Sequence, residues 1–190
     1  MARKSKPRRL KKSIVILVDG ESEIAYLNSL KKQSNIKIVP ELPKKKSFND
    51  TYNLFKEYLK DDSINELYWI IDLDVVIRED NIDTLKDINN KYSNIIINNP
   101  CLEIWFLMHY EAKNFSNSCD RVISYLKRKD EFKNYTKSPK EIPKITEKLL
   151  KKGLLKNAIT NSKSRECNFE TLNSCSTMYI LFDNVFKVEE

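Results

Sequence analysis

Glycine is almost missing from this chain. Only Gly20 and Gly153 occur among its 190 residues, whereas average usage of roughly 7% would give about thirteen. Phosphate-binding loops of the Walker and dinucleotide types need several glycines at fixed spacing. Neither glycine has such companions, so the sequence excludes both kinds of loop. The position of Gly20, directly after an apolar run, predicts a tight turn that leads into a helix.

Histidine and closely spaced cysteines are also scarce. His109 is the only histidine, and the four cysteines form no Cys-x-x-Cys pair. A zinc site is therefore poorly supported. We expect the cysteines to be reduced thiols, because stable disulfides belong to oxidising compartments.

Long apolar runs are absent as well. No stretch approaches the roughly 20 residues that a membrane-spanning helix needs. The basic start of the chain is not followed by the apolar core of a secretory signal. We expect a cytoplasmic protein with no membrane association, whose length fits one domain with a sizeable core.

The formal net charge of +7 comes from one end of the chain. Seven of the 34 basic residues lie in residues 1–12, and the other 27 equal the acidic residues in number. Such a basic arm favours nucleic acid as a partner, held through its phosphates in a salt-dependent way. A solvated tail explains the same composition. A second basic segment, residues 44–46, is interpreted as a surface loop or a phosphate clamp.

Short apolar runs rich in β-branched residues predict the strands. They occupy residues 13–18, 36–39, 67–71 and 94–98. Segments with helical spacing of apolar residues separate them, at residues 22–32, 49–60 and 81–91. Alternation of strands and helices is typical of a parallel sheet with right-handed crossovers.

Two of these strands end in carboxylates. Asp19-Gly20-Glu21 follows the first strand, and Asp72-Leu73-Asp74 follows the strand at residues 67–71. The carboxyl ends of parallel strands lie at one edge of a sheet, where ligands bind. If the strand continues to Asp74, Asp72 and Asp74 point to the same side. Such oxygen donors suit Mg²⁺ or Mn²⁺, although aspartates at strand ends also form turns and helix caps.

Glu103 lies in a segment that is otherwise almost wholly apolar, residues 99–109. We expect a buried helix here, starting with Asn99 as its cap and Pro100 in its first turn. A buried carboxylate is costly when unpaired, so Glu103 needs a partner or a task. His109 is six residues away and not on the same helix face, so we expect it to have a structural role.

The rest of the chain is predicted to be mainly helical. Helices are expected near residues 119–128, 139–150 (ended by Gly153) and 154–162, then a polar connection at 170–177 and a last amphipathic helix. The predicted organisation is a basic arm at residues 1–12, an α/β core at 13–112 and a helical extension at 113–190 packed on the core.

At these motifs the chain resembles the RloB family, abortive-infection proteins with a TOPRIM domain. TOPRIM domains place Glu-Gly after the first strand and Asp-x-Asp after the third, and Asp19-Gly20 and Asp72-Leu73-Asp74 match those positions. The resemblance extends over residues 21–23, 99–109 and 173–179. It implies an α/β fold, a TOPRIM-like Rossmannoid parallel sheet flanked by helices with a helical C-terminal extension, and phage defence alongside an ATPase partner encoded nearby.

One residue departs from the TOPRIM pattern. Asp19 stands where the family places a glutamate that is regarded as a general acid or base and metal ligand. Its side chain is one methylene shorter. Glu21 could take its place, the site could tolerate Asp, or catalysis could be weak or absent.

Three classes of function follow from these observations. The first is a Mg²⁺-dependent nuclease or related phosphodiester enzyme. The second is a non-catalytic subunit of an ATPase-containing defence complex that binds nucleic acid, nucleotide or a partner. The third is a doubly wound nucleotide-binding domain whose acids only cap helices. For the enzyme, the predicted catalytic residues are Asp19, Glu21, Asp72, Asp74 and Glu103. The first four are also the predicted metal ligands, and Glu103 supports the site.

Overall fold

A four-stranded sheet forms the centre of the computed structural model, which describes residues 13–18, 20–31, 47–115 and 117–186. The strands are β1 (Ile14–Leu17), β2 (Glu66–Asp72), β3 (Ile95–Asn99) and β4 (Cys175–Ser176), in that order across the sheet. β1, β2 and β3 are parallel, and β4 is antiparallel to β3. The predicted α/β class and the pairing of the first strand with the Asp72 strand are confirmed. The basic arm, the predicted strand at 36–39 and residues 44–46 lie outside the described residues.

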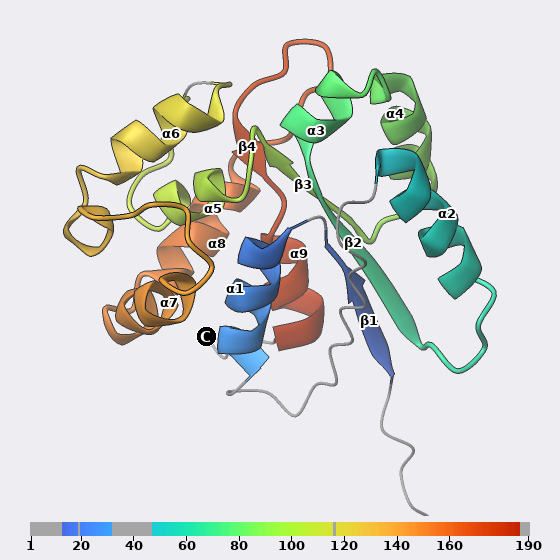
Figure 1. Cartoon of the computed structure of the whole chain (residues 1–190), viewed down its shortest axis with the longest axis horizontal. Coiled ribbons are helices and arrows are strands. Elements are labelled where there is room, and N and C mark those ends of the chain that lie inside the picture. The colour runs from blue at the N-terminus through green and yellow to red at the C-terminus, as the bar shows by residue number, and fades with distance from the viewer. Residues whose placement is uncertain (1–12, 19, 32–46, 116, 187–190) are drawn as a thin grey trace, which may run out of the picture.

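The sheet separates two layers of helices (Figure 1). One face carries α2 (Phe48–Tyr58), α3 (Leu73–Arg78) and α4 (Ile82–Lys91). The opposite face carries α1 (Glu21–Lys31), α5 (Glu103–Met108), α6 (Cys119–Leu126), α7 (Ile142–Lys151), α8 (Leu155–Lys163) and α9 (Tyr179–Leu181). A 3₁₀ turn, Asp130–Phe132, precedes α7, and a π-helical segment, Phe182–Phe186, follows α9.

Alternating side chains of the strands supply both layers of the core. On β1, Ile14 and Ile16 pack against the α1 side, whereas Val15 and Leu17 pack against the α2 side. On β2, Trp69 is fully buried and stacks on Phe48 of α2. Strands buried on both faces explain the continuous apolar runs in the sequence.

Local sequence signals set several helix ends. Ser47 caps α2 by accepting a hydrogen bond from the Asp50 N–H, and the Asp50 side chain accepts from the Ser47 N–H in return. α7 ends in a Schellman motif, with Gly153 at φ +68°. The N–H of Leu154 donates to the Leu149 carbonyl, and that of Gly153 donates to Leu150. The prediction that Gly153 ends this helix is confirmed.

β2 ends at Asp72 and α3 begins at Leu73, so the condition under which Asp72 and Asp74 would point to the same side of a strand is not met. The start of one helix was predicted wrongly. The helix expected from Asn99 begins only at Glu103. β3 continues through Asn99, the Asn99–Pro100 peptide bond is cis, and Asn99 Nδ2 donates to the Leu172 and Asn173 carbonyls. Asn99 therefore ties down the C-terminal segment instead of capping a helix.

The C-terminal part also contributes to the sheet. The polar connection expected at residues 170–177 contains β4, whose Cys175 and Ser176 pair with Asn99 and Asn98. Thr177 adds a further contact between the C-terminal segment and β3, since its Oγ1 accepts a hydrogen bond from the Ile97 N–H at 2.8 Å. A strand of two residues has no apolar periodicity, which is why the sequence did not indicate it.

The cysteines contradict the expectation of reduced thiols. Cys101 pairs with Cys119 and Cys167 with Cys175, with Cα–Cα distances of 5.9 and 5.3 Å. These distances lie within the usual range for disulfides. The fold brings together cysteines that sequence spacing gave no reason to pair.

Within the part of the chain that the structure describes, no helix has the length and apolar character needed to cross a membrane.

Candidate carboxylate site

The end of β2 presents Asp72 to the helical layer that contains α1 and α5. Tyr68 and Ile70 pack on that layer, and Asp72 continues their alternation along the strand. On the neighbouring strand, Ile96 and the fully buried Asn98 continue in the same way, and Asn98 pairs in register with Asp72. Polar side chains of two adjacent strands therefore meet at the carboxyl edge of the sheet.

The first turn of α3 brings Asp74 to the same edge. Its N–H donates to the Pro100 carbonyl at 3.2 Å, which joins the end of β2 to the turn before α5. Asp74 Oδ1 is buried and accepts no hydrogen bond from any residue that the structure describes. Asn98 Nδ2 is buried without an acceptor among the same residues, although Asn98 Oδ1 accepts from Ser176 Oγ at 2.8 Å. A buried polar atom without a partner costs free energy, and it marks a position that a ligand or water can satisfy.

Helix capping by Asp72 has little support in the structure. Asp72 occupies the N-cap position of α3 with extended backbone angles, but its side chain makes no capping hydrogen bond. A role for Asp72 as a helix cap therefore lacks the side-chain hydrogen bond that defines such a cap.

Glu23 joins this side of the sheet from α1, although sequence analysis did not select it. Its side chain is buried, whereas Glu21, two residues earlier on the helix, is exposed. Gly20 explains how the Glu23 carboxylate fits, because a Cβ on Gly20 would lie 2.5 Å from Glu23 Oε2. Gly20 is thus needed for a close approach to a carboxylate. The spacing of a glycine and a glutamate three residues later was the signal that could have identified Glu23.

Glu103 has the partners that its burial requires. At the start of α5, the fully buried Glu103 accepts a hydrogen bond from the Tyr135 hydroxyl at 2.9 Å. Lys137 Nζ lies 3.8 Å from Glu103 Oε2. Burial raises the pKa of Tyr135, and the negative charges of Glu103 and Glu23 raise it further. Tyr135 therefore stays protonated and donates to Glu103. Its pKa responds to the charges of both Glu103 and Glu23.

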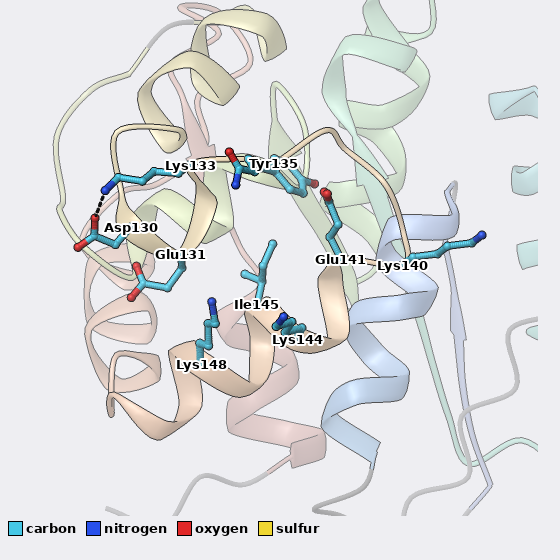
Figure 2. Close-up of a pocket in the computed structure, with 10 residues that line it drawn as sticks. Asp130, Glu131, Lys133, Tyr135, Lys140, Glu141, Lys144, Ile145 and Lys148 are labelled. Atoms are coloured by element: carbon cyan, nitrogen blue, oxygen red, sulfur yellow. Dashed lines mark ion pairs between the residues drawn. The ribbon is translucent and has the colours of Figure 1, made fainter.

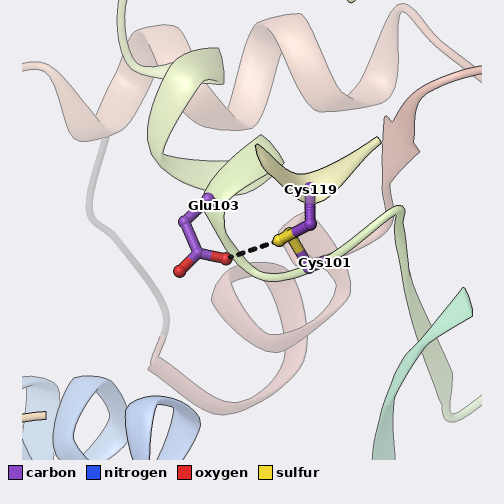
Figure 3. Close-up of side chains that lie close together, drawn as sticks. All are labelled: Cys101, Glu103 and Cys119. Atoms are coloured by element: carbon purple, nitrogen blue, oxygen red, sulfur yellow. Dashed lines mark hydrogen bonds between the residues drawn. A yellow bond between two sulfur atoms is a disulfide. The ribbon is translucent and has the colours of Figure 1, made fainter. Parts of the chain in front are cut away.

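A disulfide lies directly against Glu103 (Figure 3). Cys119 Sγ is 3.6 Å from Glu103 Oε2 and 3.3 Å from Lys137 Nζ. A disulfide sulfur has no proton, so the contact with Glu103, drawn as a dashed line, becomes a hydrogen bond only when Cys119 is a thiol. Among described residues, Cys101, Glu103 and Cys119 are the group of three metal-type ligands with all ligand atoms within 4.8 Å. In the disulfide form the sulfurs are not thiolates, so this group is not a metal site.

His109 has the structural role that was predicted. It is buried at the end of α5, and its Nδ1 lies 3.0 Å from the Trp105 carbonyl oxygen. That oxygen can only accept, so the proton is on Nδ1. Burial lowers the pKa of His109 to about 4, against the raising effect of its hydrogen bonds to the backbone of Trp105 and Phe106.

The predicted site residues therefore have different positions. Asp19 lies outside the described residues, and Glu21 is exposed in the first turn of α1. Asp72 and Asp74 lie at the carboxyl edge of the sheet, and Glu103 lies in the layer that Asp72 faces. Among described residues, the predicted carboxylates do not form a group of three with ligand atoms within 4.8 Å. The predicted roles of these residues stay predictions.

Comparison with known proteins gives one assignment. No curated protein and no solved structure matches the chain. A family model described as RloB-like protein matches residues 14–185, which is most of the chain and includes β1, the carboxylate edge and α9. The chain belongs to the RloB-like protein family.

Proposed function

We propose that this chain is a metal-dependent nuclease, or a related phosphodiester-processing protein, in phage defence. The RloB-like family suggests a defence-associated protein, and the carboxylate edge supports the chemistry. The observation that carries the proposal is the buried Asp74 Oδ1, which accepts no hydrogen bond from the described residues at an edge already rich in acids. A divalent cation would satisfy this oxygen.

The donor set fits Mg²⁺ or Mn²⁺ of a TOPRIM-type site. Asp72 and Asp74 would hold the ion through carboxylate oxygens, with Asp19 or Glu21 assisting. When bound, the ion supplies charge neutralisation on a phosphate and acidifies water. Glu23 adds negative charge on the same side of the sheet, and Glu103 keeps the Tyr135 hydroxyl in place at 2.9 Å.

The test replaces both aspartates at once. Asp72→Asn with Asp74→Asn is expected to abolish Mn²⁺ binding in titration calorimetry and any cleavage of single- or double-stranded DNA or RNA. Stability without metal is expected to stay equal or to rise, because neutralising neighbouring carboxylates removes like-charge repulsion. Asp62→Asn with Asp87→Asn is the matched control, since both side chains are exposed and the charge change is the same.

Wild-type affinity for Mn²⁺ in the Asp72/Asp74 variant would show that the metal site is wrong. A loss of about 0.5–2 kcal/mol of stability per residue would instead indicate structural caps.

A non-catalytic role in an ATPase-containing defence complex is the second candidate. It is favoured by one observation, that the described carboxylates do not close into a group of three with ligand atoms within 4.8 Å. Binding of Mn²⁺ by the wild-type chain without any cleavage would support this candidate over the nuclease.

A further inference from the structure

A pocket of about 310 Å³ lies between α7 and the chain segment before it (Figure 2). Four lysines line it: Lys133, Lys140, Lys144 and Lys148. We call it the lysine pocket. Its volume is near the lower end for small-ligand sites, which run from roughly 300 to 1,000 Å³. Unlike most such sites, it is lined mainly by charged side chains.

Two of the three acids in the lysine pocket already have partners. Asp130 pairs with Lys133 at 3.0 Å. Glu131 pairs with Lys152 and accepts from the Tyr110 hydroxyl at 2.6 Å. Burial alone would raise the pKa of Glu131, but the hydrogen bonds from Lys152 and Tyr110 lower it to about 2. These acids are therefore not available to neutralise the remaining lysines.

The third acid, Glu141, is held by Thr136. Glu141 Oε2 accepts from the Thr136 N–H at 3.0 Å and from its hydroxyl at 3.2 Å. By contrast, Lys140, Lys144 and Lys148 make no ion pair or side-chain hydrogen bond with any described residue. Unpaired cations gathered around a hollow attract anions, and phosphate groups most of all.

The arrangement of these lysines points to a small anionic group. Lys144 and Lys148 are four residues apart and lie on one face of α7. In Figure 2, Lys148 extends between Glu131 and Ile145, whereas Lys140 points away from Lys144 and Lys148. Lys144 and Lys148 are thus the two cations best placed for one ligand.

The lysine pocket shares a wall with the layer that faces the carboxylate site. Tyr135 lines the pocket, and its hydroxyl donates to Glu103 at 2.9 Å. We propose that Lys144 and Lys148 hold a backbone phosphate of a nucleic acid whose strand continues toward the carboxylate edge. The proposal rests on the proposed function for its ligand class. It adds a phosphate site that the carboxylate motifs do not contain.

The test measures salt-dependent binding by the full-length chain. Lys144→Gln with Lys148→Gln is compared with Lys60→Gln with Lys156→Gln, which removes two exposed lysines outside the pocket. Fluorescein-labelled single-stranded DNA and RNA are titrated in EDTA, so that metal binding plays no part. Thermal melts check the fold.

We expect the pocket variant alone to bind more weakly and to lose slope in log K against log salt. The loss should be about 0.7, because the two lysines hold one phosphate and each neutralised phosphate of a single strand contributes about 0.7. An unchanged slope, a loss equal to that of the control pair, or no nucleic-acid binding by the wild-type chain would overturn the proposal. The last result would favour an acidic protein partner.

The test of the lysine pocket can fail or succeed independently of the test of the carboxylate site. A slope loss in the pocket variant, with Mn²⁺ binding and cleavage absent from the wild type, would keep the lysine pocket and reject the nuclease. Cleavage lost in the Asp72/Asp74 variant, with equal slopes for both lysine variants, would do the reverse.

Discussion

Buried polar side chains separate structural from functional roles in this protein. Glu103 at the start of α5 and His109 directly after its end are both fully buried, and both have hydrogen-bonding partners within the fold. Asp74 Oδ1 and Asn98 Nδ2 are buried without a partner among the described residues. Stability alone explains the burial of Glu103 and His109. The buried atoms of Asp74 and Asn98 need a ligand or a water molecule as a partner.

His109 should make stability depend on pH. Its folded pKa of about 4 lies below the ordinary value of 6.5, so the unfolded chain binds a proton that the folded chain does not. Stability therefore falls as pH drops below 6.5 and stops falling, for this group, near pH 4. The expected total is about 3 kcal/mol, at roughly 1.4 kcal/mol per pH unit.

Urea unfolding of the wild type and of His109→Gln at pH 7, 6 and 5 checks this. The glutamine amide can still donate to the Trp105 carbonyl, and it does not titrate. Glu131, with a pKa lowered to about 2 by Lys152 and Tyr110 after the opposing effect of burial, loses its contribution only below pH 4.5. Parallel pH dependence in the two proteins would contradict the assignment to His109.

Single residues were predictable from the sequence where an apolar pattern surrounded them. Asp72 and Glu103 stood out because each interrupts a buried apolar run, and the structure places both on the same side of the sheet. Glu23 did not stand out, because a glutamate in the first turn of a helix is ordinary. Its carboxylate fits because Gly20, three residues earlier, has no side chain, and that glycine–glutamate spacing was the one local signal for it.

Helices and strands were also predictable only where a local sequence pattern marked them. The long parallel strands were predictable because their apolar runs are continuous, and Gly153 marked the end of α7. β4 was not predictable, since its two residues gain their identity only from pairing with β3. The late start of α5 was also hidden, because Asn99 and Pro100 favour a helix start as well as the strand and cis bond that occur.

The turn between β3 and α5 is joined to α6 by the Cys101–Cys119 disulfide, which spans 18 residues. Loop-closure entropy for that separation is worth about 3 kcal/mol. Cys101→Ser with Cys119→Ser should lower the free energy of unfolding by about this amount in the absence of reductant. Chemical denaturation of protein purified without reductant provides the measurement.

The matched control is Cys167→Ser with Cys175→Ser, whose 8-residue separation predicts a smaller loss of about 2.5 kcal/mol. Thiol counting in denaturant gives a direct check. The unreduced wild type should show no free thiol, and the reduced protein should show four. Four free thiols before reduction would restore the prediction made from the sequence.

The charge of the whole molecule is divided between a basic arm and a body whose basic and acidic residues are equal in number. In the body, the proposed phosphate site depends on the fold, which gathers Lys144 and Lys148 at one pocket. The arm needs no fold to attract a polyanion. Two independent electrostatic contributions should therefore add when nucleic acid binds.

Removing residues 1–12 should weaken nucleic-acid binding and leave the fold intact. The deletion removes seven positive charges, and each that contacts a single-strand phosphate contributes about 0.7 to the salt slope. The expected slope loss is therefore at most about 5, and it adds to that of the lysine-pocket variant. A full-length chain with the same seven residues changed to Gln is the control, because it keeps the length and removes only charge.

Fluorescence anisotropy across a salt titration measures both slopes, and circular dichroism with thermal melts monitors the fold. Equal affinity of the full-length and shortened chains at every salt concentration would rule out a role for the arm, and would leave the lysine pocket to account for binding alone.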